Sequence, residues 1–423
     1  MTQPSPDGPL RRRSFLMGAA GLAAAGSLSA CGAGGSTGQE LEFFQFKSEA
    51  IGLFDEMCKS YNATASGHSF KQNFQADNVT ALRVRLVKER MPDAITINGD
   101  YNYGSLARSG VFYDFAPTGL LDDVQDAVSQ ILPSLGTGGE GQVNGLPLAN
   151  NGSGIIYNKA IFAKHGAKPP TTWDELMDLC AMFESKGVDP IFWGLKDNWT
   201  GAPMLSSLSG DFLTDGVAAW YDRRMTGEVG FDDLRPVFTK MLKLASMGNK
   251  NKFELGYNDA NQGFAKGQSA MYIHGTYAIP AIRSYNPDIK LGTFAMPADD
   301  EADTKVVSGV DVALLLPTAP KREREGLAFM EYLMAPKNMK SYCDAQVAYP
   351  TLKGMKPADE ALQGLQPYFD NDRLATYSDH NFPQGMNLNN YMQQFLVTRD
   401  VDWFVKTLDT QWNKVTARLA QTR

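Results

Sequence analysis

Hydrophobic and polar positions near the start of the chain alternate with two different periods. Short runs of apolar and aromatic residues have the length of strands. Between these runs, apolar residues recur three or four positions apart, which is the spacing of a helix. The predicted strands are 41–46, 68–74 and 93–98, and the predicted helices are 50–63 and 80–90. Because strands that alternate with helices usually pair in parallel, the pattern predicts an α/β lobe with a parallel sheet.

The same two patterns return further along the chain. The stretch 169–187 predicts a helix that Thr171 or Thr172 can cap, and Gly187 ends it. The other predicted elements are strands at 189–195 and 307–317, a strand, turn and helix over 269–282, a helix over 322–336, and a helical tail. A stretch rich in Gly and Asn, 135–154, predicts turns and a crossing between lobes.

The first 31 residues have the order of an export signal. A basic cluster precedes an apolar segment, and small residues precede Cys31. The stretch from Arg12 to Leu16 resembles a twin-arginine signal, and the stretch from Leu28 to Cys31 resembles a bacterial lipobox. We expect residues 1–30 to be removed, Cys31 to carry a lipid, and 31–38 to form a flexible tether. An ordinary secretory signal with a chance cysteine is the alternative.

Composition narrows the class of protein further. The 423 residues carry a net charge of −7, which argues against a nucleic-acid partner, and their 43% hydrophobic content is that of a soluble globular protein. Cys58, Cys180 and Cys343 lie far apart in helical patterns, so we expect buried free thiols. The four histidines lack metal-ligand spacing, and no glycine-rich phosphate motif occurs, so neither a metal nor a cofactor is expected.

Candidate chemistry gathers in the loops after predicted strands, where α/β sheets bind their ligands. Asp197 and Trp199 form the sharpest pair, because an indole stacks on the C–H face of a sugar and a carboxylate accepts its hydroxyl protons. Trp173, Trp193 and Trp220 are predicted to be core residues. The other polar candidates at predicted strand ends are Lys47, Glu49, Asp77 and Asp100.

Several stretches together resemble a known family. In order, the chain contains PPTTWDEL, PIFWGLKDNWT, GQSAMYIHGTYAIPAI, SGVDVALLLP and AYPTLKG. This series resembles the family 1 extracellular solute-binding proteins, the sugar receptors of ABC importers, over the whole chain after the signal. The resemblance implies an α/β, two-lobe, periplasmic-binding-protein-like fold with a ligand cleft between lobes that close by hinge bending. It places crossings near 147–152, 304–308 and 346–350, with lobe 1 at 39–148 plus 307–346 and lobe 2 at 149–306 plus 347–423.

The resemblance also implies which residues bind the ligand. The stretch HGTYA carries Tyr277 where the family usually has a tryptophan, and Phe382 matches a further aromatic position only loosely. The positions that the resemblance assigns to the ligand site are Lys47, Glu49, Asp100, Asp197, Trp199, Tyr277, Asp311 and Phe382.

The implied function is that of a lipid-anchored, monomeric receptor outside the cytoplasm. It would pass a di- or trisaccharide to membrane permease subunits and would not be an enzyme. One alternative is a receptor for a non-sugar solute such as a peptide or polyamine. The other is a glycoside hydrolase, which would need two carboxylates, such as Asp197 and Asp311, on either side of the scissile bond.

Overall fold

The computed structural model describes residues 38–383 and 385–421. The residues from Gly38 onward form one compact unit. The predicted export signal, the lipid-bearing Cys31 and nearly all of the predicted tether lie outside the described residues.

One mixed sheet of ten strands organises this unit, with the order β2-β1-β3-β8-β4-β6-β5 along its main path. β1 pairs in parallel with β2 and with β3, which confirms the predicted parallel start. β8 joins the sheet antiparallel to both β3 and β4. The strands are β1 (Gln39–Gln45), β2 (His68–Phe74), β3 (Ala94–Ile97), β4 (Leu146–Asn158), β5 (Asp189–Ile191), β6 (Ser269–Gly275), β7 (Leu291–Phe294), β8 (Val306–Leu315), β9 (Tyr349–Pro350) and β10 (Leu374–Ala375).

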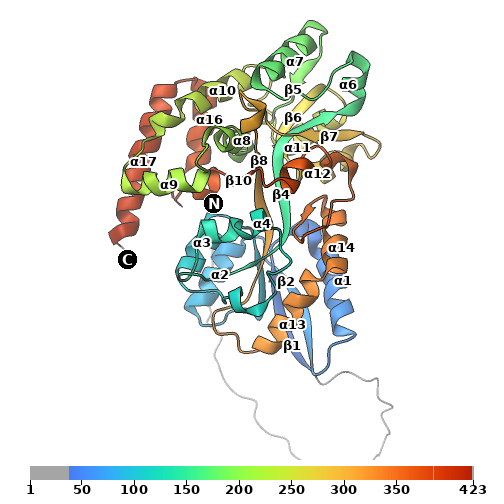
Figure 1. Ribbon diagram of the computed structural model, residues 1–423, viewed down its shortest axis with the longest axis vertical. Coiled ribbons are helices and arrows are strands. Elements are labelled where there is room, and N and C mark those ends of the chain that lie inside the picture. Colours follow the sequence, from blue (N-terminus) through green and yellow to red (C-terminus); the bar gives the residue numbers. More distant parts are fainter. Residues whose placement is uncertain (1–37, 384, 422–423) are drawn as a thin grey trace, which may run out of the picture. The chain divides into compact units, whose positions relative to one another are not determined.

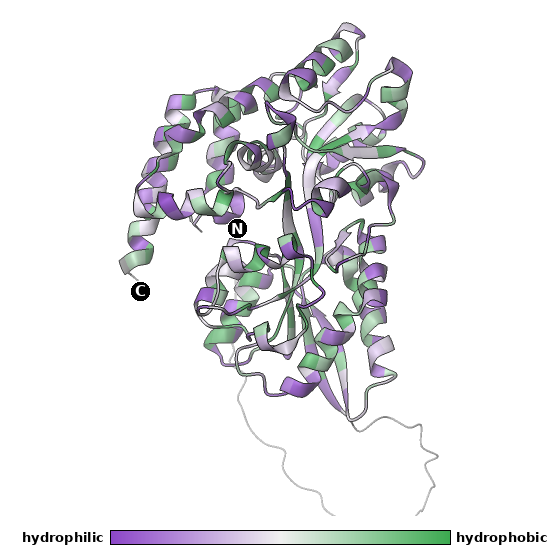
Figure 2. Ribbon diagram, in the orientation of Figure 1, coloured by the Kyte–Doolittle hydropathy of each residue, from purple (hydrophilic) through white to green (hydrophobic). Residues whose placement is uncertain are grey.

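Helices cover this sheet and form two separate groups. The first group contains α1 (Ile51–Asn62), α2 (Asn78–Val87), α3 (Tyr101–Arg108), α4 (Asp126–Ser129), α5 (Ile131–Leu135), α13 (Glu323–Met334) and α14 (Pro336–Gln346). The second group contains α6 (Lys159–His165), α7 (Trp173–Ser185), α8 (Ala202–Phe212), α9 (Val217–Thr226), α10 (Arg235–Ala245), α11 (Tyr257–Ala265), α12 (Ala278–Tyr285), α15 (Gln366–Asp370), α16 (Leu388–Thr398) and α17 (Val401–Gln421). Hydrophobic and hydrophilic positions alternate along most of these helices, as expected where one face packs inward (Figure 2).

Buried side chains divide in the same way and define two lobes. Lobe 1 packs around Phe43, Phe54 and Phe329, whereas the largest cluster of lobe 2 packs around Trp220 and Trp412. The two-lobe α/β architecture therefore agrees with the sequence expectation. The chain boundaries given above for each lobe stay a prediction.

Two long strands connect the lobes. The last residues of β8 pair with β3 in lobe 1, and its first residues pair with β10 in lobe 2. β4 begins beside β8 and ends between β6 and β7 in lobe 2. Figure 1 shows both strands running from one lobe into the other. A third connection runs through β9, which pairs with the middle of β4.

The prediction of turns over 135–154 is wrong for its second half, because Leu146 already begins the 13-residue strand β4. Glycine and asparagine disfavour strands, but here tertiary contacts outweigh that preference. The side-chain amide of Asn150 donates to Ser308 Oγ (3.3 Å), and Ser308 Oγ donates to the backbone oxygen of Asn151 (2.8 Å). Partners on β8 therefore satisfy polar groups of a buried strand.

The predicted strand over 189–195 is shorter in the structure, since β5 ends at Ile191. The backbone N–H of Trp193 donates to the side chain of Asn249 (2.8 Å), and that of Leu195 donates to the backbone oxygen of Lys252 (2.7 Å). The chain leaves the sheet here and runs toward the segment before α11. The other predicted strands and helices are present, with ends shifted by a few residues.

Several predictions about single side chains are confirmed. Cys58, Cys180 and Cys343 are buried and free, and burial raises the pKa of the Cys58 and Cys180 thiols to about 12. The three tryptophans predicted as core are buried. Thr172 caps α7 by accepting the backbone N–H of Glu175 (3.3 Å). In the part of the chain described, no helix has the length and apolar character needed to cross a membrane.

Candidate ligand-binding site

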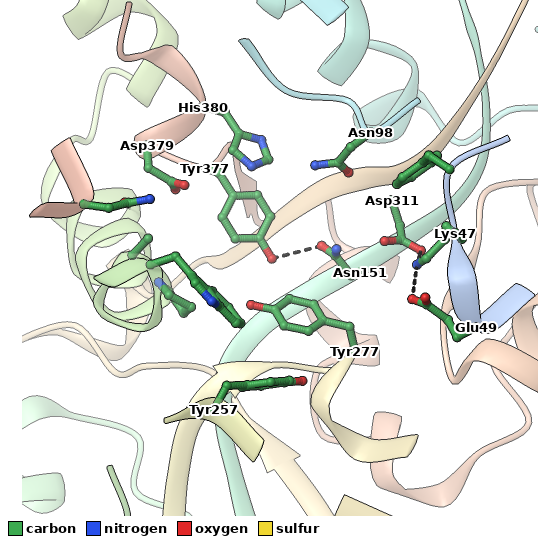
Figure 3. Close-up of a pocket in the computed structure, with 15 residues that line it drawn as sticks. Lys47, Glu49, Asn98, Asn151, Tyr257, Tyr277, Asp311, Tyr377, Asp379 and His380 are labelled. Atoms are coloured by element: carbon green, nitrogen blue, oxygen red, sulfur yellow. Dashed lines mark hydrogen bonds and ion pairs between the residues drawn. The ribbon is translucent and has the colours of Figure 1, made fainter. Parts of the chain in front are cut away.

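A cavity of about 450 Å³ lies where the crossing strands β4 and β8 meet loops from both lobes. Figure 3 shows charged and aromatic side chains on its different walls. The lining residues are Phe46, Lys47, Glu49, Asn98, Asn151, Trp199, Ala202, Pro203, Tyr257, Tyr277, Asp311, Tyr377, Asp379, His380 and Asn389.

Lobe 1 supplies a charged wall. Lys47 is the second residue after β1, is only 8% exposed, and forms an ion pair with Asp311 on β8. The Lys47 ammonium also lies 3.5 Å from the carboxylate of Glu49. Burial by itself would lower the pKa of Lys47, but the two carboxylates outweigh burial and raise it. Burial would likewise raise the pKa of Glu49, but Lys47 outweighs it and lowers that pKa. Lys47 and Glu49 are therefore held in their charged forms.

Lobe 2 supplies an aromatic wall made of Trp199, Tyr257 and Tyr277. Trp199 lies in a short 3-10 turn (Asn198–Gly201), and its ring centroid is 5.0 Å from that of Tyr257. Tyr277 follows the turn after β6. These three side chains are all half-buried, so part of each ring faces the cavity. The wall therefore combines wide apolar faces with two phenol hydroxyls.

A buried histidine lies behind this wall. The ring of His274 on β6 contacts Trp199 at 5.2 Å and 74°, Tyr277 at 5.2 Å and 89°, and Tyr257 at 5.1 Å. Its Nδ1 accepts the backbone N–H of Gly275 (3.1 Å). Burial lowers the pKa of His274 to about 3, so the imidazole is neutral and packs as one more ring.

The inner side of the cavity is a hydrogen-bonded network on the crossing strands. The hydroxyl of Tyr377 donates to the side-chain oxygen of Asn151 on β4 (2.9 Å; Figure 3). The same hydroxyl lies 2.7 Å from the hydroxyl of Ser153. Beside it, Asp379 accepts a hydrogen bond from Ser206 Oγ (2.6 Å). The ring of His380 lies 4.7 Å from that of Tyr377. This network fixes acceptors and donors at the base of the cavity.

The comparisons with known proteins agree with this arrangement. A sequence profile for bacterial extracellular solute-binding proteins matches residues 47–340. The chain belongs to this family. It is the family that the sequence motifs indicated, which includes the sugar-binding proteins of ABC importers.

Similar proteins cover most of the solute-binding protein described here. A multiple sugar-binding protein of Streptococcus mutans is 27% identical over 371 residues, which are 85% of this chain and 84% of that protein. The apo form of RafE from Streptococcus pneumoniae has a TM-score of 0.79 at 24% identity, over 90% of this chain and 99% of the other. RafE in complex with raffinose gives a TM-score of 0.74 over 89% of this chain and 99% of the other.

Five of the residues predicted from the sequence of this solute-binding protein line the cavity. They are Lys47, Glu49, Trp199, Tyr277 and Asp311. Asp311 reaches it from the middle of β8, whereas the others follow strands or lie in turns.

The structure does not bring the other four predicted residues to the cavity. Asp77 is exposed before α2, and Asp100 caps α3 by accepting the backbone N–H of Asn102 (2.8 Å). Phe382 is buried in the lobe 2 core, where its ring stacks 5.4 Å from Phe231. Asp100 and Phe382 therefore have local structural roles that sequence spacing did not reveal.

Asp197 supports the site from behind. Its Oδ2 accepts the backbone N–H of Tyr257 (2.7 Å), so the carboxylate holds an aromatic wall residue in place. In this position it does not face Asp311 across the cavity, which is the arrangement that the hydrolase alternative requires.

The sequence reasoning missed the other ten lining residues, which are Phe46, Asn98, Asn151, Ala202, Pro203, Tyr257, Tyr377, Asp379, His380 and Asn389. Asn98 is the last residue of the predicted strand 93–98 and directly follows β3 in the structure, so the strand-end rule could have included it. The aromatic and acidic residues between 377 and 380 come from a segment without a regular pattern, and only the fold brings them beside β4. Among the described residues, no group of three or more His, Cys, Asp or Glu is arranged to hold a metal ion.

Proposed function

We propose that this protein is a lipid-anchored receptor that captures a di- or trisaccharide in the cavity and delivers it to the permease subunits of an ABC importer. The observation that carries the proposal is the opposition of two walls. Lobe 2 presents the rings of Trp199, Tyr257 and Tyr277, and lobe 1 presents Lys47 and Asp311. A sugar has apolar C–H faces and a belt of hydroxyls, so it can use both walls at once.

The position of the walls supports capture by hinge closure. The charged and aromatic walls belong to different lobes, so one ligand contacts both only when the lobes approach each other. Closure would then be stabilised by the ligand itself and would signal occupancy to the permease. The volume of about 450 Å³ lies within the range of roughly 300–1000 Å³ typical of small-molecule sites.

The names of similar proteins support a sugar as ligand. Besides the multiple sugar-binding protein and RafE with raffinose, a sugar transporter of Bacillus licheniformis with bound stachyose has a TM-score of 0.70 at 19% identity, over 89% of this chain and 100% of the other. The cavity itself supports the same class of ligand. Its aromatic rings and uncharged polar groups suit a neutral polyhydroxy ligand better than a charged solute such as a polyamine, which needs oppositely charged groups around it.

The attachment to the membrane rests on the sequence between Arg11 and Cys31. Export through the twin-arginine route, followed by lipid modification of Cys31, would leave the folded unit tethered outside the cytoplasm. The test is metabolic labelling with a fatty acid in the native host. Label should be incorporated into the wild type and absent from Cys31→Ala, and label retained by the variant would exclude this anchor.

The function is tested by ligand-induced stabilisation of residues 38–423. A sugar that binds only the folded state must raise the melting temperature. When its concentration is a hundredfold above Kd, it adds about 2.7 kcal/mol to the free energy of unfolding. Mono-, di- and trisaccharides are screened at millimolar concentration against the wild type, Trp199→Ala and the control Trp403→Ala. Trp403 is a half-buried tryptophan on α17 that does not line the cavity.

The expected result is a shift for one or more sugars that Trp199→Ala loses and Trp403→Ala keeps. A shift that survives Trp199→Ala would keep the sugar class but remove Trp199 from the site. The absence of any shift would favour a non-sugar solute, and peptides and polyamines would then be screened in the same way.

A further inference from the structure

A second cavity of about 280 Å³ lies beside the first, and His380 lines both. It is formed by α3 and α5 of lobe 1 together with α9, α17 and the His380 segment of lobe 2. The inner side of the first cavity is closed by Asn151 and Asp311 on the crossing strands. His380 is therefore the residue at which the two cavities adjoin.

The lobe 1 side of this second cavity carries an aromatic surface. Tyr101, the first residue of α3, lines the cavity and is half-buried. The guanidinium of Arg108 lies over its ring, 5.7 Å from the centroid, and donates to the backbone oxygen of Leu135. A ring with one face supported by a fixed cation keeps its orientation, which lowers the entropy cost of stacking a ligand on it.

The lobe 2 side mixes apolar and polar groups. Met225 on α9 is 57% exposed, and its neighbours in the wall are the exposed Asp222 and the half-buried Thr416 of α17. Apolar surface next to hydroxyl and carboxylate groups is the same combination that makes the first cavity suitable for a sugar. An exposed apolar side chain at the edge of a cleft also gains from being covered by a ligand.

We propose that the second cavity is an outer subsite for further sugar units, with Tyr101 as its stacking residue. The ligand is then an oligosaccharide chain whose first units occupy the cavity of Trp199 and whose later units pass His380 toward Tyr101 and Met225. This inference rests on the proposed function and adds a dependence on chain length. Each chain that reaches the outer subsite contacts both lobes there and so also favours closure.

The test is calorimetric titration of the purified protein with two series of increasing length, raffinose to stachyose to verbascose and maltose to maltotriose to maltopentaose. In the series that binds, we expect the affinity to rise about tenfold from the shortest member to the longest. Tyr101→Ala should remove that rise and leave the affinity for the shortest member unchanged. Met225→Ala, on the opposite wall, should also reduce the gain in affinity with chain length.

Tyr285→Ala is the matched control, because Tyr285 is 46% exposed and lines neither cavity. It should keep the full rise with length. Equal affinity for short and long members in the wild type would overturn the outer subsite while leaving the proposed function intact. An equal loss for short and long members in Tyr101→Ala would also overturn it. If no sugar binds, either in these two series or in the thermal screen, the proposed function fails and the outer subsite with it.

Discussion

Lys47 and Asp311 form a buried ion pair that joins the end of β1 to the middle of β8, although 264 residues separate them in the chain. β8 is one of the strands that pass between the lobes. The pair therefore connects the charged wall of the cavity directly to a crossing strand. A ligand that bonds to either group acts on a strand whose geometry also sets the relation of the lobes.

Lys47→Met should lower the free energy of unfolding by about 2–4 kcal/mol, because it leaves the carboxylate of Asp311, which is 9% exposed, without its cation. Chemical denaturation at neutral pH measures the loss. Lys59→Met is the control: Lys59 pairs with Asp55 on the surface, where 72% and 47% of the two side chains are exposed, so its removal should lower the free energy of unfolding much less than Lys47→Met does. If Lys47→Met lowers the free energy of unfolding no more than Lys59→Met does, the buried ion pair does not stabilise the fold.

His274 should make the protein less stable as the pH falls. The pKa is about 3 in the folded protein against 6.5 for an ordinary histidine, so between these values the unfolded chain binds a proton that the folded chain does not. The contribution of the neutral His274 to the free energy of unfolding is complete above pH 6.5. Below pH 6.5 it decreases by about 1.4 kcal/mol per pH unit. Denaturation curves between pH 7.5 and 4.5 should show a shallower pH dependence for His274→Phe than for the wild type. Parallel curves would mean that His274 is not held neutral.

Anionic sugars should bind at least tenfold more weakly than neutral sugars of the same size. The cavity holds three carboxylates, those of Glu49, Asp311 and Asp379, against the single ammonium of Lys47. A difference of tenfold corresponds to about 1.4 kcal/mol, which is modest for like charges brought together in a cleft. Titration with a neutral sugar and its uronic acid measures it.

Asp379→Asn should reduce the difference in affinity between the neutral sugar and its uronic acid. This effect of the substitution should be smaller at high salt. Equal binding of the acid and the neutral sugar would show that the carboxylates do not control selection.

The amino-acid sequence by itself determined the family, the α/β class and most of the elements. These features depend on short-range patterns. The apolar run ending at Gln45 forms a strand, and Lys47 follows it, so the rule that ligands meet the carboxyl ends of strands placed Lys47 correctly. Trp199 was found for a similar reason, since polar neighbours mark its segment as a turn at the surface.

Only the tertiary structure decided which polar and aromatic residues reach the cavity. Asp197 is two residues from Trp199, yet its carboxylate bonds to the backbone of Tyr257, whereas Tyr377 arrives from a distant segment and bonds to Asn151. Phe382 and Tyr377 are both aromatic and only five positions apart, but one packs in the core and the other lines the site. The direction of a side chain depends on which partner outside its own segment satisfies it, and sequence spacing carries no record of that partner.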